Sequence, residues 1–297
     1  MDKNKEFKRL LIYLFFAFAL AWIIFIVYAA TGHKWDGSNI FLDQLVGMGM
    51  LAPVIANLLT RLVTKEGFAL NGKDSLMLGI SFKDKKWIYY VFASIIPWIY
   101  FELGYALVTL FVPKALNFEY YKTFEIGLPT VFVSPFICII GGIVGCFFAF
   151  GEEGGWRGYM MPKLINLMGI PKAVIVGGII WGLWHAPLTC VGHNFGTDYP
   201  GFPYLGILIM CIDCSFMGIM LTFITIKTGS IWPAAIMHAV NNQNPAILKY
   251  FLDIDYYEAN QPFPLFQWVG FLIPSVIIGI ICLCILLRDK RKAQKVK

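Results

Sequence analysis

The sequence predicts an all-α, polytopic membrane protein with about eight transmembrane helices, and three observations support this. Of its 297 residues, 58% are hydrophobic and only 14% are charged, whereas a typical soluble domain is about 25% charged. The apolar residues are grouped into runs of roughly 20, the length that spans a hydrocarbon core. The basic residues gather in alternate connecting segments. A chain of this composition could not hide its apolar surface in water, and a bilayer removes that requirement.

Eight apolar runs define the expected spans. Segment 64–86, which is rich in Lys, Gly and Asp, is the one sizeable polar stretch and is expected to link the second and third spans. Because no internal repeat or second domain is visible, we expect a single domain over residues 1–297, with a motif-bearing core at about 129–250. The expected spans are residues 9–30, 40–63, 87–112, 129–151, 172–190, 204–226, 230–250 and 265–287.

The distribution of Lys and Arg orients these spans. With eight spans, both termini lie on one side, and 20 of the 24 basic residues fall in segments on that side. The four that fall on the other side are Lys34, Lys114, Lys122 and Lys249. This asymmetry is the positive-inside bias, so we expect a multi-pass protein of the cell membrane with both termini cytoplasmic. We attribute the net charge of +6 to the basic residues that orient the protein in the membrane, and we expect no nucleic-acid partner.

Ionisable groups inside membrane spans are costly, so each is a functional candidate. The densest cluster, EEGGWR, closes the fourth run. Glu153 and Arg157 are four residues apart, so on a helix they face each other and can pair. Glu152 lies about 100° further round the helix and is left out of that pair. The paired Glu153 can then have a structural role, while the unpaired Glu152 is left for chemistry. The alternative is that these residues are ordinary interfacial charges at a helix end.

Two later runs carry histidines with partners at helical spacing. His185 follows Trp181 by four residues, and His238 precedes Asn242 by four. A lone membrane histidine is commonly a hydrogen-bonded structural residue, and a His–Asn pair can be a helix–helix contact. At about 1.5 Å per residue, however, Glu152, His185, His238 and Asn242 all lie roughly 13–20 Å from the same membrane surface. We therefore expect the four groups to meet in one cavity that opens toward the inside.

Other polar groups in the spans have no motif around them. Glu102 and Asp213 are expected to be buried, hydrogen-bonded acids or gate residues, and His193 in the outer loop is left out of the site. The signatures of other hydrolases, such as the zinc motif HExxH and the nucleophile elbow GxSxG, are absent from the sequence.

The three motifs together resemble the CAAX prenyl protease and bacteriocin-processing (CPBP) family. That family is marked by EExxxR, FxxxH and HxxxN on successive helices, and the resemblance covers roughly residues 129–245. Trp181 stands where the family usually has Phe. The matching positions in this sequence are Glu152, Glu153 and Arg157, then His185, then His238 and Asn242.

The resemblance implies an eight-span intramembrane endopeptidase that acts on membrane-associated proteins or peptides in the lipid bilayer. Glu152 would be the general base, and His185 would help to hold and polarise the attacking water. His238 and Asn242 would donate to the tetrahedral oxyanion. Glu153 and Arg157 would pair structurally and orient Glu152.

Alternatives to this interpretation remain open from the sequence. Two His and one Glu could hold zinc, but Asn is a poor zinc ligand and suits oxyanion donation, so we expect no cofactor, with zinc as the alternative. A non-catalytic immunity or scaffold protein of the same fold would use the cavity for binding alone, and complete motifs argue against it. A small transporter would be favoured by inverted repeats, and none is found.

Overall fold

The computed structural model describes residues 2–35, 39–72 and 74–295. Within these ranges the chain forms helices joined by turns, and the only β-type pairing there is an isolated bridge between Leu116 and Leu252. The predicted all-α fold class is therefore confirmed. Two of the basic residues used to orient the chain, Lys73 and Lys297, lie outside the described ranges. The α-helices are α1 (Lys3–Ala30), α2 (Ile40–Gly47), α3 (Ala52–Thr64), α4 (Trp87–Phe111), α5 (Leu128–Gly155), α6 (Met161–Met168), α7 (Ile170–Trp184), α8 (Ala186–Thr189), α9 (Tyr204–Thr228), α10 (Trp232–Asn242), α11 (Ile254–Asn260) and α12 (Phe266–Lys295).

Several helical stretches are long and apolar enough to cross a bilayer, which makes this a multi-pass membrane protein. Among the described residues there are six such stretches: Lys3–Ala30, Ile40–Thr64, Trp87–Phe111, Leu128–Met168, Tyr204–Thr228 and Phe266–Lys292. The fifth and seventh expected spans correspond to α7, with 15 residues, and α10, with 11. Both are shorter than the roughly 20 residues of a full span, so the count of eight stays a prediction.

The fourth expected span is much longer than its apolar run. α5 continues through a π-helical turn at Trp156–Met160 into α6, so that one stretch runs for 41 residues from Leu128 to Met168. Single π turns inside α-helices are common at functional sites. The continuation places Glu152 and Glu153 within the helix rather than at its end, as the argument from depth required.

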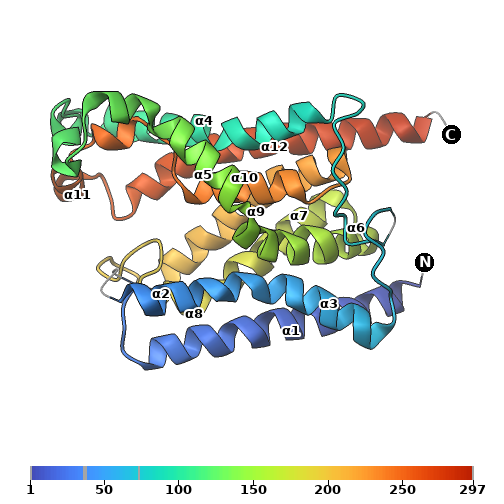
Figure 1. Ribbon diagram of the computed structural model, residues 1–297. Helices are drawn as coiled ribbons and strands as arrows, with labels where there is room; N and C mark the ends of the chain where they lie inside the picture. Colours follow the sequence, from blue (N-terminus) through green and yellow to red (C-terminus); the bar gives the residue numbers. More distant parts are fainter. Residues whose placement is uncertain (1, 36–38, 73, 296–297) are drawn as a thin grey trace.

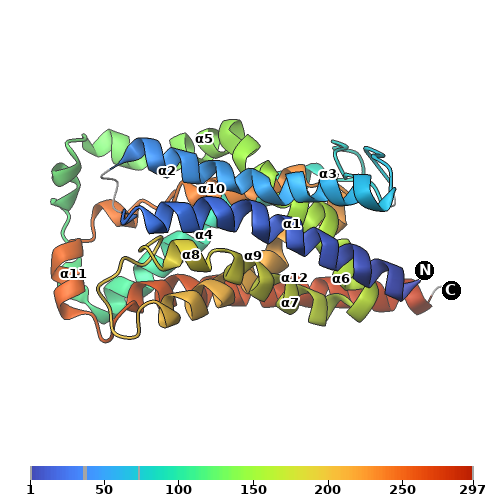
Figure 2. The same cartoon turned by 90° about the horizontal axis from the view of Figure 1, so that it is seen from below.

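The ends of the bundle separate the connecting segments into two groups. Figures 1 and 2 show both termini at one end, together with the loop that joins α3 to α4. α11 and the loop between α8 and α9 lie at the other end in both views. We call these the termini end and the distal end. This alternation matches the predicted arrangement, and the assignment of the termini end to the cytoplasm stays a prediction.

Glycines allow the site-bearing helices to approach very closely. A Cβ atom on Gly178 would lie 2.2 Å from the Cα of Ser215, and one on Gly182 would lie 2.4 Å from the Cα of Cys211. Small residues four apart let membrane helices pack backbone to backbone. The contact between α7 and α9 therefore depends on both glycines, and it sets the position of His185, the residue that follows α7.

A similar contact positions the third motif. A Cβ on Gly142 of α5 would lie 2.8 Å from both the N and the Cα of Val240 in α10. Because α10 lies directly against α5 at this level, His238 is brought beside the glutamates of α5.

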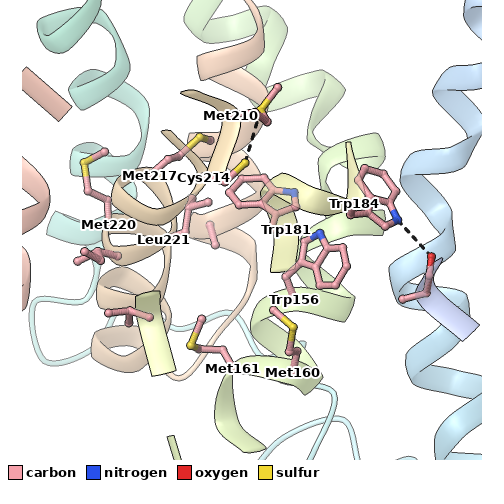
Figure 3. Close-up of a cluster of buried hydrophobic side chains, with 14 of the residues drawn as sticks. Trp156, Met160, Met161, Trp181, Trp184, Met210, Cys214, Met217, Met220 and Leu221 are labelled. Atoms are coloured by element: carbon pink, nitrogen blue, oxygen red, sulfur yellow. Dashed lines mark hydrogen bonds between the residues drawn. The ribbon is translucent and has the colours of Figure 1, made fainter. Parts of the chain in front are cut away.

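Large side chains fill the space between these helices and α1. Figure 3 shows the rings of Trp156, Trp181 and Trp184 gathered together, with sulfur-containing side chains of α9 on the far side of Trp181. The rings of Trp156 and Trp184 meet edge to face with centroids 5.9 Å apart. Trp184 donates from Nε1 to the carbonyl oxygen of Ala17 in α1, at 3.1 Å. This packing gives the polar side chains nearby a rigid support.

Candidate functional site

Glu153 contacts two other residues of the motifs. Its Oε1 lies 3.1 Å from Nη1 of Arg157 and 2.9 Å from Nδ1 of His238. The pair with Arg157 is the one expected from the spacing of four residues, whereas the contact with His238 was not predicted. All three side chains are buried. Because Glu153 joins α5 to α10, it links the first and third motifs directly.

Glu152 is held by two tryptophans rather than by a cation. Its Oε2 accepts hydrogen bonds from Nε1 of Trp181 at 2.7 Å and from Nε1 of Trp156 at 3.3 Å. The sequence interpretation had assigned the orientation of Glu152 to the Glu153–Arg157 pair. Arg157 contributes to the orientation of Glu152 only through Trp181, because its Cζ lies 4.3 Å from the centroid of that ring. The Trp that replaces the usual Phe of the family thus supplies a hydrogen-bond donor that Phe lacks.

His185 has a defined tautomer in its neutral form. Its Nδ1 lies 2.9 Å from the carbonyl oxygen of Trp181. A carbonyl oxygen only accepts, so Nδ1 carries the proton, and Nε2 of the neutral ring is left as an acceptor. The hydrogen bond and the edge-to-face contact with Trp184, at 4.8 Å between centroids, fix the orientation of the ring.

His193 was left out of the predicted site, but the fold places it beside His185. The two imidazoles are stacked, with an interplanar angle of 11° and centroids 6.1 Å apart. Burial, and secondarily the neighbouring His185, lower the pKa of His193 to about 3, so its ring is neutral at physiological pH. The depth of a residue in the membrane can be counted along a helix but not along a loop. The sequence could not place His193 beside His185, because only the fold determines the path of the loop between α8 and α9.

One cavity of about 640 Å³ joins the four groups predicted to meet. Glu152, His185, His238 and Asn242 all line it, whereas Glu153 and Arg157 are not among its lining residues. Trp181 lies between the two motif histidines, with its ring centroid 6.0 Å from that of His185 and 5.4 Å from that of His238. Further polar lining residues that the sequence did not assign to the site are Asp43, Tyr100, His193, Asn194, Asp213, Asn241, Asn244, Gln267 and Ser275.

The cavity extends toward the distal end and not toward the termini end. Its lining includes Trp35 from the loop after α1, Asn194 from the loop before α9, and Gln267 near the start of α12, and these segments lie at the distal end (Figure 1). The cavity therefore reaches the distal end, whereas the sequence interpretation expected it to open toward the end where the termini were placed.

A buried polar network closes the termini end, which explains the direction of the cavity. Arg61 donates to the carbonyl oxygens of Gly67, Asp74 and Ser75 in the loop between α3 and α4. Glu66 accepts from Nζ of Lys163 at 2.7 Å and from the hydroxyl of Tyr159 at 2.5 Å. These contacts fasten the loop over the end of the bundle beneath the site.

Asn242 ends α10 and is exposed at the cavity. Its Oδ1 accepts from Nδ2 of Asn241 at 3.2 Å, and Asn241 in turn accepts from the hydroxyl of Tyr100. With its oxygen engaged by Asn241, Asn242 is oriented so that its amide group serves as a donor.

Glu102 has a structural role, as the sequence interpretation allowed. Its carboxylate accepts from the backbone N–H of Ile247 at 2.9 Å and of Leu248 at 3.3 Å. It therefore holds the segment that follows α10, and it is not among the residues that line the cavity.

Among the residues that the structure describes, no group of three His, Cys, Asp or Glu side chains is arranged to hold a metal. Nδ1 of each motif histidine is bonded, to Glu153 or to the carbonyl of Trp181, which leaves Nε2 as the free ring nitrogen, and Glu152 accepts from two indoles.

The fold and the cavity define a multi-pass α-helical membrane protein with acidic, imidazole and amide side chains converging in its interior. Residues 132–243, which contain all three motifs, match the family model described as Type II CAAX prenyl endopeptidase Rce1-like. CAAX prenyl protease 2 of Methanococcus maripaludis is 32% identical over 128 residues, which cover 43% of this chain and 44% of that protein. The chain thus matches less than half the length of this curated relative. Both matches confirm the resemblance to the CAAX prenyl protease family that the motifs indicated.

Proposed function

We propose that the protein is an intramembrane endopeptidase that hydrolyses peptide bonds of membrane-associated proteins or peptides with water activated by Glu152. The observation that carries this proposal is the shared cavity. Groups suited to activating water and to stabilising an oxyanion come from α5, α7 and α10 and line one interior space. The similarity to CAAX prenyl endopeptidases over residues 132–243 supports the same reaction class.

The chemistry assigns one role to each lining group. Glu152 accepts a proton from water as the oxygen attacks the scissile carbonyl carbon, and Nε2 of His185 accepts a hydrogen bond that holds this water. The negative charge that develops on the carbonyl oxygen receives hydrogen bonds from His238 and Asn242. Glu152 then returns its proton to the leaving amine as the C–N bond breaks. Preorganised donors of this kind are commonly the largest single contribution to catalysis.

Glu153 acts in this mechanism as a positioning residue. Its carboxylate balances the charge of Arg157 and supplies a counter-charge for a protonated His238, with contacts of 3.1 and 2.9 Å. A protonated imidazole bonded to Glu153 through Nδ1 still has an N–H at Nε2 that can donate to the oxyanion. The Glu153–His238 pair thus acts on the oxyanion site, while the indoles of Trp156 and Trp181 orient the base, Glu152.

We propose that the reaction needs no metal. Glu152 is engaged by two N–H donors, and Asn242 is a poor zinc ligand but a good oxyanion donor. The mechanism above draws every proton transfer and every stabilising contact from the chain itself.

Comparison of membrane peptides tests the proposed function. Membranes that contain the wild-type protein are compared by peptidomics with membranes that contain Glu152→Ala at equal abundance. We expect new peptide termini that depend on Glu152. Identical termini in the two samples would favour the non-catalytic alternative, in which the cavity only binds.

A further inference from the structure

A second cavity, of about 420 Å³, lies apart from the cavity of the site. It is bounded by the loop between α3 and α4, by α6 and by the C-terminal part of α9. This loop and α6 lie at the termini end (Figure 1). Among the described residues, none lines both cavities. Three buried basic side chains line the second one: Arg61, Arg157 and Lys163.

Arg61 is a buried cation whose hydrogen bonds all go to neutral acceptors. Its Nε donates to Oδ1 of Asn57 at 2.8 Å, and its two terminal nitrogens donate to the carbonyl oxygens of Gly67, Asp74 and Ser75. The carboxylate of Asp74 is the one acidic group in the described lining, and this residue is exposed. Burial of a charge is costly unless an opposite charge replaces the water. The guanidinium of Arg61 therefore favours an anion in the cavity.

Two further lining residues have polar atoms without a partner. Nε of Arg157 and Oγ1 of Thr222 make no hydrogen bond among the described residues, although the two residues are only 2% and 1% exposed. Buried polar groups in proteins nearly always have a partner. Arg157 is paired with Glu153 through Nη1, and Lys163 is paired with Glu66 at 2.7 Å. The unused groups can donate, so a ligand rich in acceptors would satisfy them.

The rest of the wall is mainly apolar and reaches the outer surface of the bundle. Met161, Ile165 and Ile170 line it, together with Ile226 of the membrane-spanning α9, which is 43% exposed. The cavity thus combines buried cationic donors with an apolar side at one end of the membrane-spanning helices. Basic pockets between such helices on the cytoplasmic side are typical sites for anionic lipid head groups.

We propose that this second cavity is a binding site for a phosphate group, carried by an anionic phospholipid or present as free phosphate. The phosphate oxygens accept from the guanidinium groups of Arg61 and Arg157, which match phosphate in shape and charge, and from the hydroxyl of Thr222. The acyl chains of a lipid lie along the apolar side. Because Arg157 also holds Glu153, the phosphate site and the catalytic cavity share one side chain. Binding at this site does not depend on the proposed peptidase function.

Thermal unfolding of the purified full-length protein in a neutral detergent tests the site. The protein is titrated with dioctanoyl phosphatidylglycerol, with dioctanoylglycerol, which has the same chains and no phosphate, and with inorganic phosphate. We expect a saturable rise in the unfolding temperature with phosphatidylglycerol and none with dioctanoylglycerol. An equal rise with inorganic phosphate identifies the free anion as sufficient, and a rise with the lipid alone shows that the chains contribute.

Thr222→Val is the sharpest variant, because Oγ1 of Thr222 has no partner in the described protein whose loss would weaken the fold. It should unfold at the wild-type temperature without ligand and need roughly tenfold more lipid or phosphate for half of the rise, as expected for one hydrogen bond to a charged group. Arg61→Gln should abolish the rise. Lys172→Gln removes an exposed charge near the start of α7, outside the lining, and should respond as the wild type does.

The same titrations can overturn the inference. No rise with either phosphatidylglycerol or inorganic phosphate would show that the cavity binds no phosphate. A wild-type response in Thr222→Val would contradict the site even if Arg61→Gln did not fold. Equal losses in Lys172→Gln and Arg61→Gln would show that the lipid acts through the general surface charge.

Discussion

Nδ1 of His238 lies 2.9 Å from Oε1 of Glu153, although 85 residues separate them in the chain. The contact turns two sequence motifs into one unit, because the same oxygen also accepts from Arg157. It assigns the two adjacent glutamates to different partners: Glu153 faces charged groups and Glu152 faces indole N–H donors. The different partners predict different consequences of substitution.

Glu152→Gln should abolish turnover and leave the fold intact. The Gln side chain can still accept from Trp156 and Trp181 through its oxygen, but it cannot take a proton from water. Loss of a general base typically costs about 10²–10⁴ in rate. The measurement is kcat on a cleaved peptide together with the thermal unfolding temperature in detergent. Normal cleavage by this variant would show that another group is the base.

Glu153→Gln should lower stability as well as rate. It leaves Arg157 and His238 without their counter-charge inside the protein, and breaking a buried ion pair costs about 3–5 kcal/mol. We expect a clear drop in the unfolding temperature. Glu119→Gln is the control, because Glu119 pairs with Lys122 at the exposed surface and its loss should leave the unfolding temperature unchanged. Equal stability of the two variants would contradict the role given to Glu153.

Substitutions of Asn242 separate the metal-free mechanism from a zinc mechanism. Loss of one oxyanion donor costs about 10²–10³ in rate, so Asn242→Ala should be strongly impaired. Asn242→Asp should be at least as damaging, because a carboxylate repels the oxyanion. In a zinc site Asp is a competent ligand and would outperform Ala. We also expect the wild-type enzyme to stay active in strong chelators, and inactivation that added zinc reverses would overturn the mechanism.

The orientation in the membrane can be measured with single cysteines in a chain whose native cysteines are replaced by Ser. Lys83→Cys tests the loop at the termini end, and Asp198→Cys tests the loop before α9. Both positions are exposed. An impermeant thiol reagent added outside intact cells should label position 198 and not position 83. Labelling of position 83 instead would reverse the assignment of the termini to the cytoplasm.

Glu66 predicts a pH dependence of stability. Burial alone would raise its pKa, but hydrogen bonds from Lys163, Thr64 and Tyr159 hold the pKa below the ordinary value of 4.5. The ionised form therefore stabilises the fold above about pH 4.5, and this stabilisation is lost as the pH falls below that value, through the lowered pKa. Unfolding temperatures measured between pH 7 and pH 3 should fall less steeply for Glu66→Gln. Parallel curves for the two proteins would contradict this role.

The sequence by itself determined the helical membrane fold, the motif residues and the Glu153–Arg157 pair. These follow from local properties: the length of an apolar run, the alternation of basic loops, and the geometry of residues four apart on one helix. The family resemblance added the expectation that the residues of the three motifs form one site.

Only the tertiary structure decided which way the cavity faces and which side chains complete it. The contact between Glu153 and His238, the stacking of His193 on His185, and the presence of Asp43 and Asp213 all join elements that are distant in the chain. The positions of the short helices α7 and α10 also depend on their neighbours. Glycine contacts set the depth of α7 against α9 and of α10 against α5. The number of residues along one helix cannot specify such contacts, because they depend on how separate helices pack against one another.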